Sequence, residues 1–118
     1  MSINVIFQST IIMINELVID NMAERFKLLG EPMRLKILSA LNKTELCVQD
    51  LVDKTGTGQA NISKHLALMA TNGILGRRKD GLHVYYYIKD DSVMKICDLV
   101  CKRMENLNVG NNNSSGTE

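Results

Sequence analysis

The sequence predicts a mostly α-helical domain with one β-hairpin, an α+β fold in the order helix, helix, helix, helix, strand, strand, helix. Three observations predict it. Apolar residues recur at intervals of three and four along much of the 118-residue chain, which is the spacing of amphipathic helices. Aromatic residues make up only 4% and tryptophan is absent, which disfavours an all-β sandwich. Near residue 80 the apolar period changes to two on either side of an Asp-Gly pair, which is typical of a hairpin.

Four helices are expected before the hairpin. Gly30 is the predicted C-cap of the first, Pro32 suits the first turn of the second, and Gly73 stops the fourth. A glycine-containing turn at 55–58 separates the third helix from the fourth. The predicted ranges are 14–29, 31–42, 47–54 and 59–72.

The hairpin strands are expected at 74–79 and 83–88, and the last helix at about 91–107. The whole domain is therefore expected to cover 13–108. Residues 1–12 are expected to form a poorly ordered leader and 109–118, which are polar and of low complexity, a disordered tail.

The apolar N-terminal region does not have the pattern of an export or membrane segment. Its first basic residue is Arg25, and polar residues interrupt the apolar run. Three cysteines are too few for a disulfide scaffold, so the sequence favours a reducing cytoplasm and no membrane partner.

Positive charge is concentrated in one part of the chain. The formal net charge is +1, but residues 57–89 carry five basic residues and one acidic residue, a local net charge of +4. The flanking blocks 1–56 and 90–118 are both net negative. A local basic block of this kind is typical of phosphate binding, and a solvated basic hairpin is the alternative.

The fourth helix strengthens the interpretation as a DNA-binding surface. Ile62, Leu66 and Met69 share one helical face, which is predicted to be its core side. The opposite face carries small or hydrogen-bonding side chains and one lysine, and no acidic residue occurs in 59–72. Such a face can approach the major groove closely. With the third helix it forms a predicted helix-turn-helix.

The stretches LLGEPMRLKILSAL (28–41), ELCVQDL (45–51), TGTGQANISKHLALMATNGIL (55–75) and RRKDGLHVYYYI (77–88) resemble the ArsR/SmtB family of bacterial repressors. The resemblance implies a winged helix-turn-helix, a homodimer built on the first and last helices, and release from a DNA operator by an inducer. Carried over by position, it places the DNA-binding residues on the fourth helix and the hairpin wing. They are Gln59, Ala60, Asn61, Ser63, Lys64, His65, Arg77, Arg78 and Lys79. His65 also lies beside the core-facing arc, so a structural role for it stays open.

The cysteines are the candidate inducer site. Many family members hold thiophilic metals with an ELCVCDL box, but here Gln49 replaces the second cysteine and only Cys47 remains. Cys97 and Cys101 lie one helical turn apart, a spacing that allows two side chains to hold one ion. No cofactor is required, and trivalent arsenic, trivalent antimony or a soft metal ion is the candidate inducer. Packing in a dimer interface is the alternative role of this pair.

Cys47 offers a second possibility, because it occupies the predicted N-cap of the third helix. The positive end of the helix dipole favours a thiolate there, and with it oxidation or persulfidation.

The sequence thus predicts a dimeric repressor of double-stranded DNA with a palindromic operator, released by a thiol-reactive inducer. A redox or reactive-sulfur sensor acting through Cys47 is the closest alternative. No phosphate loop, paired-carboxylate motif or His–Glu metal motif occurs, which disfavours an enzyme. A small thiol enzyme and a protein-binding winged helix remain the alternatives from other classes.

Overall fold

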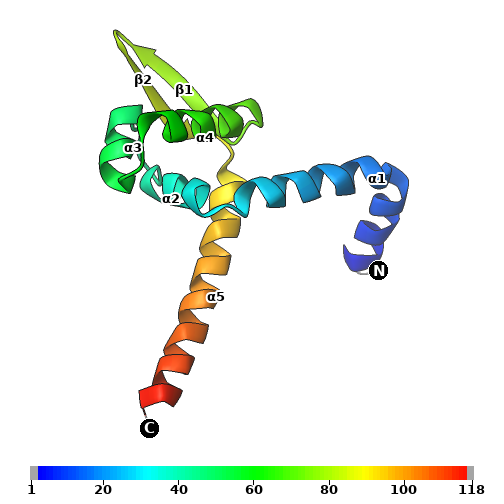
Figure 1. Ribbon diagram of the computed structural model, residues 1–118. Coiled ribbons are helices and arrows are strands. Elements are labelled where there is room, and N and C mark those ends of the chain that lie inside the picture. Colours follow the sequence, from blue (N-terminus) through cyan, green and yellow to red (C-terminus); the bar gives the residue numbers. More distant parts are fainter. Residues whose placement is uncertain (1–2, 117–118) are drawn as a thin grey trace. The chain divides into compact units, whose positions relative to one another are not determined.

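The computed structural model describes the backbone of residues 3–116 and the side chains of residues 16–108. Its elements follow the predicted order of four helices, a hairpin and a last helix (Figure 1). They are α1 (Ile3–Leu29), α2 (Pro32–Ala40), α3 (Val48–Thr55), α4 (Gln59–Thr71), β1 (Leu75–Asp80), β2 (His83–Ile88) and α5 (Asp91–Gly116). Within the described residues, no helix is both long enough and apolar enough to cross a membrane.

The outer helices extend beyond their predicted ranges. Helix α1 begins at Ile3 instead of residue 14, and no proline or glycine precedes Gly30 to interrupt it. Helix α5 continues to Gly116 instead of ending near residue 107. The side chains of 1–15 and 109–118 lie outside the described residues, so the division into leader, domain and tail stays a prediction.

The chain divides into two compact units, Met1–Lys36 and Ile37–Glu118. In the first unit, Leu28 and Leu29 are buried at the end of α1. The first turn of α2 is capped within the same unit, because the backbone N–H of Arg34 donates to Glu31 Oε2 at 2.9 Å. This cap accounts for a helix that begins at Pro32, one residue after the predicted start, and the helix ends at Ala40 instead of residue 42.

The second unit holds a core of aliphatic side chains. Ile62, Leu66 and Met69 of α4 are fully buried, which confirms the predicted core side of that helix. The other buried apolar side chains of the unit come from α2 and the turn that follows it, from α3, from the start of the hairpin and from the first turn of α5. They are Ile37, Leu38, Leu41, Leu51, Ile74, Leu75 and Val93.

Helix α4 ends where the sequence predicts. Gly73 has a φ of +76°, a left-handed conformation that favours glycine. Its N–H donates to Ala70 O at 3.1 Å, and the N–H of Ile74 donates to Met69 O at 3.0 Å. These two bonds form a Schellman motif, which stops the helix and turns the chain into β1.

Strands β1 and β2 form an antiparallel hairpin in which Asp80 pairs with His83. The two loop residues are therefore Gly81 and Leu82, one position later than the predicted Asp80-Gly81 turn. Gly81 has a φ of +63° and Leu82 does not share this conformation, which is the pattern of a type II′ turn. The register places Asp80 in the ladder, and this corrects the predicted turn.

An isolated β-bridge joins Leu46 to the edge of the hairpin, and the sequence does not predict this pairing. The N–H of Leu46 donates to Tyr86 O at 3.1 Å, and the N–H of Tyr86 donates to Leu46 O at 2.8 Å. This bridge attaches the segment that leads into α3 to the outer edge of β2.

Candidate nucleic-acid interface

The exposed face of α4 carries most of the side chains predicted to contact DNA. Gln59, Ala60, Ser63 and Lys64 are exposed, as are Ala67 and Thr71 further along the helix. None of the residues of α4 is acidic. The burial of Ile62, Leu66 and Met69 on the other side fixes which face the helix presents.

Two predicted contact residues have a different environment. Asn61 is half-buried, and its Nδ2 donates to Thr57 Oγ1 at 3.2 Å. This bond ties the start of α4 to the turn that precedes it. His65 is only 6% exposed, because it faces the same side as Leu66 and Met69. Burial of His65 does not fit a DNA contact, and we leave it out of the proposed set.

A groove separates α4 from β1. It is lined by Ala67, Ala70, Thr71, Leu75 and Arg77. The small side chains of α4 form one wall, and Arg77 brings a positive charge to the other. Arg77 therefore lies beside the exposed face of α4. A DNA strand bound along this face would bring its phosphates close to the Arg77 side chain.

The three basic residues of β1 divide between the two faces of the hairpin. Because side chains alternate along a strand, Arg77 and Lys79 share one face, and Arg78 lies on the other with Asp80. Cross-strand pairing adds Tyr85 opposite Arg78. Within the described residues, no ion pair involves the side chain of Arg77 or Lys79.

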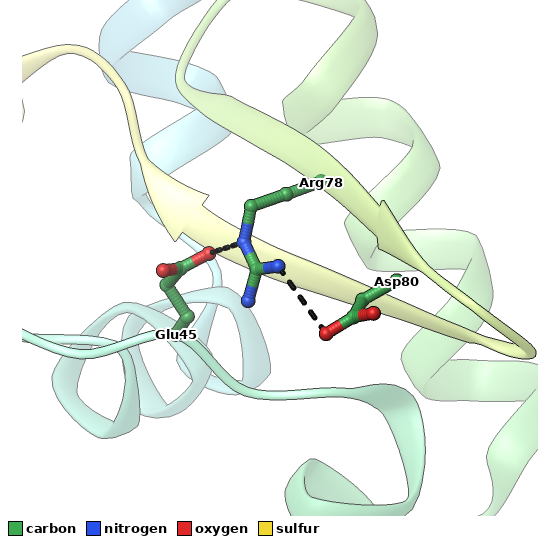
Figure 2. Close-up of polar contacts among 3 residues, drawn as sticks. All are labelled: Glu45, Arg78 and Asp80. Carbon is green, nitrogen blue, oxygen red and sulfur yellow. Dashed lines mark hydrogen bonds and ion pairs between the residues drawn. The ribbon is translucent and has the colours of Figure 1, made fainter.

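Arg78 contacts three side chains of its own protomer, and Figure 2 shows the two carboxylates among them. Its Nε donates to Glu45 Oε1 at 2.9 Å, and its Nη1 lies 3.6 Å from Asp80 Oδ2. The guanidinium carbon lies 5.0 Å from the centroid of the Tyr85 ring. The hydrogen bond and charge of Glu45, with a smaller contribution from Asp80, raise the pKa of Arg78 above its usual value. The sequence did not reveal Glu45 as a partner, because the contact spans 33 positions.

Cys47 is the N-cap of α3, as predicted, and Asp50 completes the cap. The Asp50 Oδ2 atom accepts from the backbone N–H of Cys47 at 3.1 Å and from its thiol at 3.2 Å. These two hydrogen bonds lower the pKa of Asp50, and Lys54 and His83 lower it further.

Cys97 and Cys101 are both on α5, with Cys97 half-buried and Cys101 exposed. Burial is the larger cause that raises the pKa of the Cys97 thiol, and the electrostatic effect of the nearby Cys101 raises it further. The Cys101 thiol is 3.7 Å from Glu105 Oε1. Among the residues described, no three His, Cys, Asp or Glu side chains are gathered closely enough to hold a metal ion.

Residues 31–75, from α2 to the first residue of β1, match the sequence profile of the bacterial regulatory proteins of the arsR family. A helix-turn-helix-type transcriptional regulator of Methanocaldococcus jannaschii is 42% identical over 79 residues, which cover 66% of this chain and 89% of that protein. The chain belongs to the ArsR family. It is a DNA-binding transcriptional regulator of the winged helix-turn-helix type and not an enzyme.

Other ArsR-family relatives match over a shorter part of their length. The cadmium resistance regulatory protein CadC of Listeria innocua is 37% identical over 75 residues, 63% of either chain. The arsenical resistance operon repressor of Escherichia coli is 44% identical over 62 residues, 52% of this chain and 53% of that protein. The chain thus spans less than two thirds of these two relatives.

The fold agrees with a solved ArsR-family structure. The homodimeric winged helix-turn-helix DNA-binding domain of a possible ArsR-family regulator from Mycobacterium bovis superimposes with a TM-score of 0.69. The two sequences are 27% identical, and the match covers 75% of this chain and 82% of that one. In this fold α4 takes the position that is termed the recognition helix, and the β1–β2 hairpin takes the position of the wing.

Proposed function

We propose that this ArsR-family regulator is a homodimeric repressor that acts in the cytoplasm and binds a palindromic operator through α4 and the wing. The observation that carries the proposal is the exposed, acid-free face of α4 beside Arg77 across the groove. The homodimeric state of the Mycobacterium bovis domain supports a two-fold assembly. Two-fold protein symmetry then favours two half-sites about one helical turn apart, roughly 34–36 Å.

The proposed contacts divide by role. Ser63 and Lys64 are exposed in the middle of the face of α4 and suit base edges in the major groove. Gln59 and Ala60 lie at its N-terminal end, where helix N–H groups favour phosphates. Asn61 contributes through the amide atoms that its bond to Thr57 leaves available.

In vitro selection from a random DNA pool tests this proposal. We expect the full chain to enrich an imperfect palindrome and to protect both half-sites in footprinting. A chain that enriches no sequence, or that binds one half-site as a monomer, would contradict it. A winged helix that binds only protein would give the first of these results.

We further propose that a thiol-reactive inducer, a trivalent metalloid or a soft metal ion, releases the operator through Cys97 and Cys101. Two thiols four residues apart on α5 can share one ion. The relatives named for cadmium resistance and for arsenical resistance support this class of inducer. A trivalent metalloid favours three thiolates, so the third has to come from Cys47, from the partner subunit or from a small thiol.

Release requires that the inducer bind the DNA-free conformation more tightly than the DNA-bound one. A coupling of about 1–3 kcal/mol is usual for such linkage. A ligand on α5 reaches DNA by changing the spacing of the two recognition helices, whereas a modified Cys47 acts at the first residue of the helix-turn-helix itself.

Cysteine replacement separates these routes. We expect a variant with all three cysteines changed to serine to bind the selected operator normally and to ignore arsenite, Cd²⁺, peroxide and polysulfide. Loss of the arsenite and Cd²⁺ response in the Cys97→Ser, Cys101→Ser protein would support the pair. If Cys47→Ser alone abolishes a peroxide or polysulfide response while arsenite has no effect, Cys47 is a redox sensor. A triple variant that still leaves DNA with these agents would show that the cysteines only pack.

A further inference from the structure

The side chain of Arg78 is engaged within its own protomer on three sides. Glu45 and Asp80 supply two carboxylates (Figure 2), and the centroid of the Tyr85 ring lies 5.0 Å from the guanidinium carbon. Planar guanidinium groups form well-directed pairs with carboxylates and stack on aromatic rings. A phosphate that approached Arg78 would have to compete with both carboxylates, whereas Lys79 next to it has no such partner among the described residues.

Glu45, the partner of Arg78, lies in the short segment that leads into α3. It precedes Leu46, whose backbone exchanges two hydrogen bonds with Tyr86, and Cys47, which caps α3. The ion pair and the backbone bridge therefore attach the wing to the same short segment. That segment leads directly into the helix-turn-helix.

We propose that Arg78 is a positioning residue that fixes the wing to the segment before α3, and that Arg77 and Lys79 on the opposite face contact the DNA phosphates. The inference about DNA rests on the proposed function, whereas the inference about the attachment does not. The DNA-binding face of the wing is then the face that continues the groove beside α4.

The Glu45→Gln variant distinguishes positioning from direct contact by the sign of its effect. If Arg78 contacts phosphate, removal of a neighbouring carboxylate frees its charge and strengthens DNA binding. If Arg78 acts through Glu45, the same change weakens binding. We expect a loss of about two- to fivefold, the upper range for an exposed ion pair.

The salt dependence of binding supplies a second readout. With a duplex selected from a random pool by the wild-type protein, Lys79→Gln should reduce the slope of log K against log salt by about 1.8, because the dimer loses one phosphate contact in each protomer. Arg78→Gln should weaken binding but leave the slope unchanged, and adding Glu45→Gln to it should cost little more. A slope reduced as much by Arg78→Gln as by Lys79→Gln, or tighter binding by Glu45→Gln, would overturn the proposal.

A measurement without DNA tests the attachment alone. Hydrogen exchange at the amides of Leu46 and Tyr86 should be faster in Arg78→Gln and in Glu45→Gln, and unchanged in the matched control Lys79→Gln. Unchanged exchange in both variants would refute the attachment even if DNA binding behaved as expected. A wild-type chain that selects no duplex would refute the proposed function and leave the exchange result to decide the role of Arg78.

Discussion

Asp50 accepts two hydrogen bonds from Cys47 at the start of α3, and these bonds lower its pKa. A carboxylate with a pKa below its unfolded value stabilises the fold fully above that unfolded value, near 4. The contribution is lost as pH falls through the lower, folded value.

We therefore expect the Tm difference between wild type and Asp50→Asn to be largest near neutral pH and to shrink below about pH 4. Thermal melts between pH 7 and pH 2 provide the measurement. Cys47→Ala should reduce this difference without abolishing it, because the backbone N–H of residue 47 still donates. A difference that stays constant with pH would show that the cap is not ionic.

Sequence patterns identified some of these residues and not others. The N-cap position of Cys47 follows from its place before a short amphipathic segment, so it could be predicted. The partnership of Arg78 with Glu45 could not, because it depends on a bridge between Leu46 and Tyr86 that only tertiary structure creates. His65 was ambiguous for a related reason, since a helical wheel places it at the edge of the buried arc and packing decides its side.

At the scale of elements, α4 links the core to the proposed DNA surface. Leu66 is fully buried, so Leu66→Ala should lower the free energy of unfolding by about 2–5 kcal/mol. Urea denaturation measures this directly. The matched change Leu68→Ala, at a side chain 39% exposed on the same helix, should cost much less. Equal losses would mean that α4 does not pack as described.

The recognition helix and the wing should affect DNA binding differently. Replacing Lys64 with alanine should relax preference at one base position, at a cost of about 1–3 kcal/mol. Replacing Lys79 with alanine should weaken all sequences alike. Repeating the selection with each variant and comparing the enriched sites tests both expectations. A changed sequence preference in Lys79→Ala alone would reverse the two roles.

The elements were predictable where local chemistry decides them. Gly73 and Pro32 mark helix boundaries by their own conformational limits, and both boundaries lie within one residue of their predicted positions. The hairpin turn was misplaced by one residue because both Asp80-Gly81 and Gly81-Leu82 suit a two-residue loop. The choice between them depends on the register with β2, which pairs Leu75 with Ile88 at one end of the ladder and Asp80 with His83 at the other.

At the scale of the whole molecule, α5 presents an apolar stripe that its own unit does not cover. Val100 is 55% exposed, Met104 48% and Leu107 41%. The spacing of three and four places these side chains on one face of the helix. Such a stripe favours association with a second copy of the chain.

We expect Met104→Lys to shift the protein toward monomer in sedimentation experiments at micromolar concentration and to weaken binding to the palindrome. The control Asn106→Lys adds the same charge at an exposed position away from this stripe and should leave the assembly unchanged. A Met104→Lys protein that remains dimeric would place the interface elsewhere.

The pair formed by Glu45 and Arg78 also constrains how this chain can change in descent. Loss of either partner removes the reason to retain the other, so substitutions at the two positions should accumulate together in descendant sequences. A lineage that lost the glutamate first would pass through an ancestor whose wing is held to the segment before α3 by the backbone bridge alone. Such an ancestor would bind its operator more weakly, and natural selection would then favour a compensating replacement of the arginine.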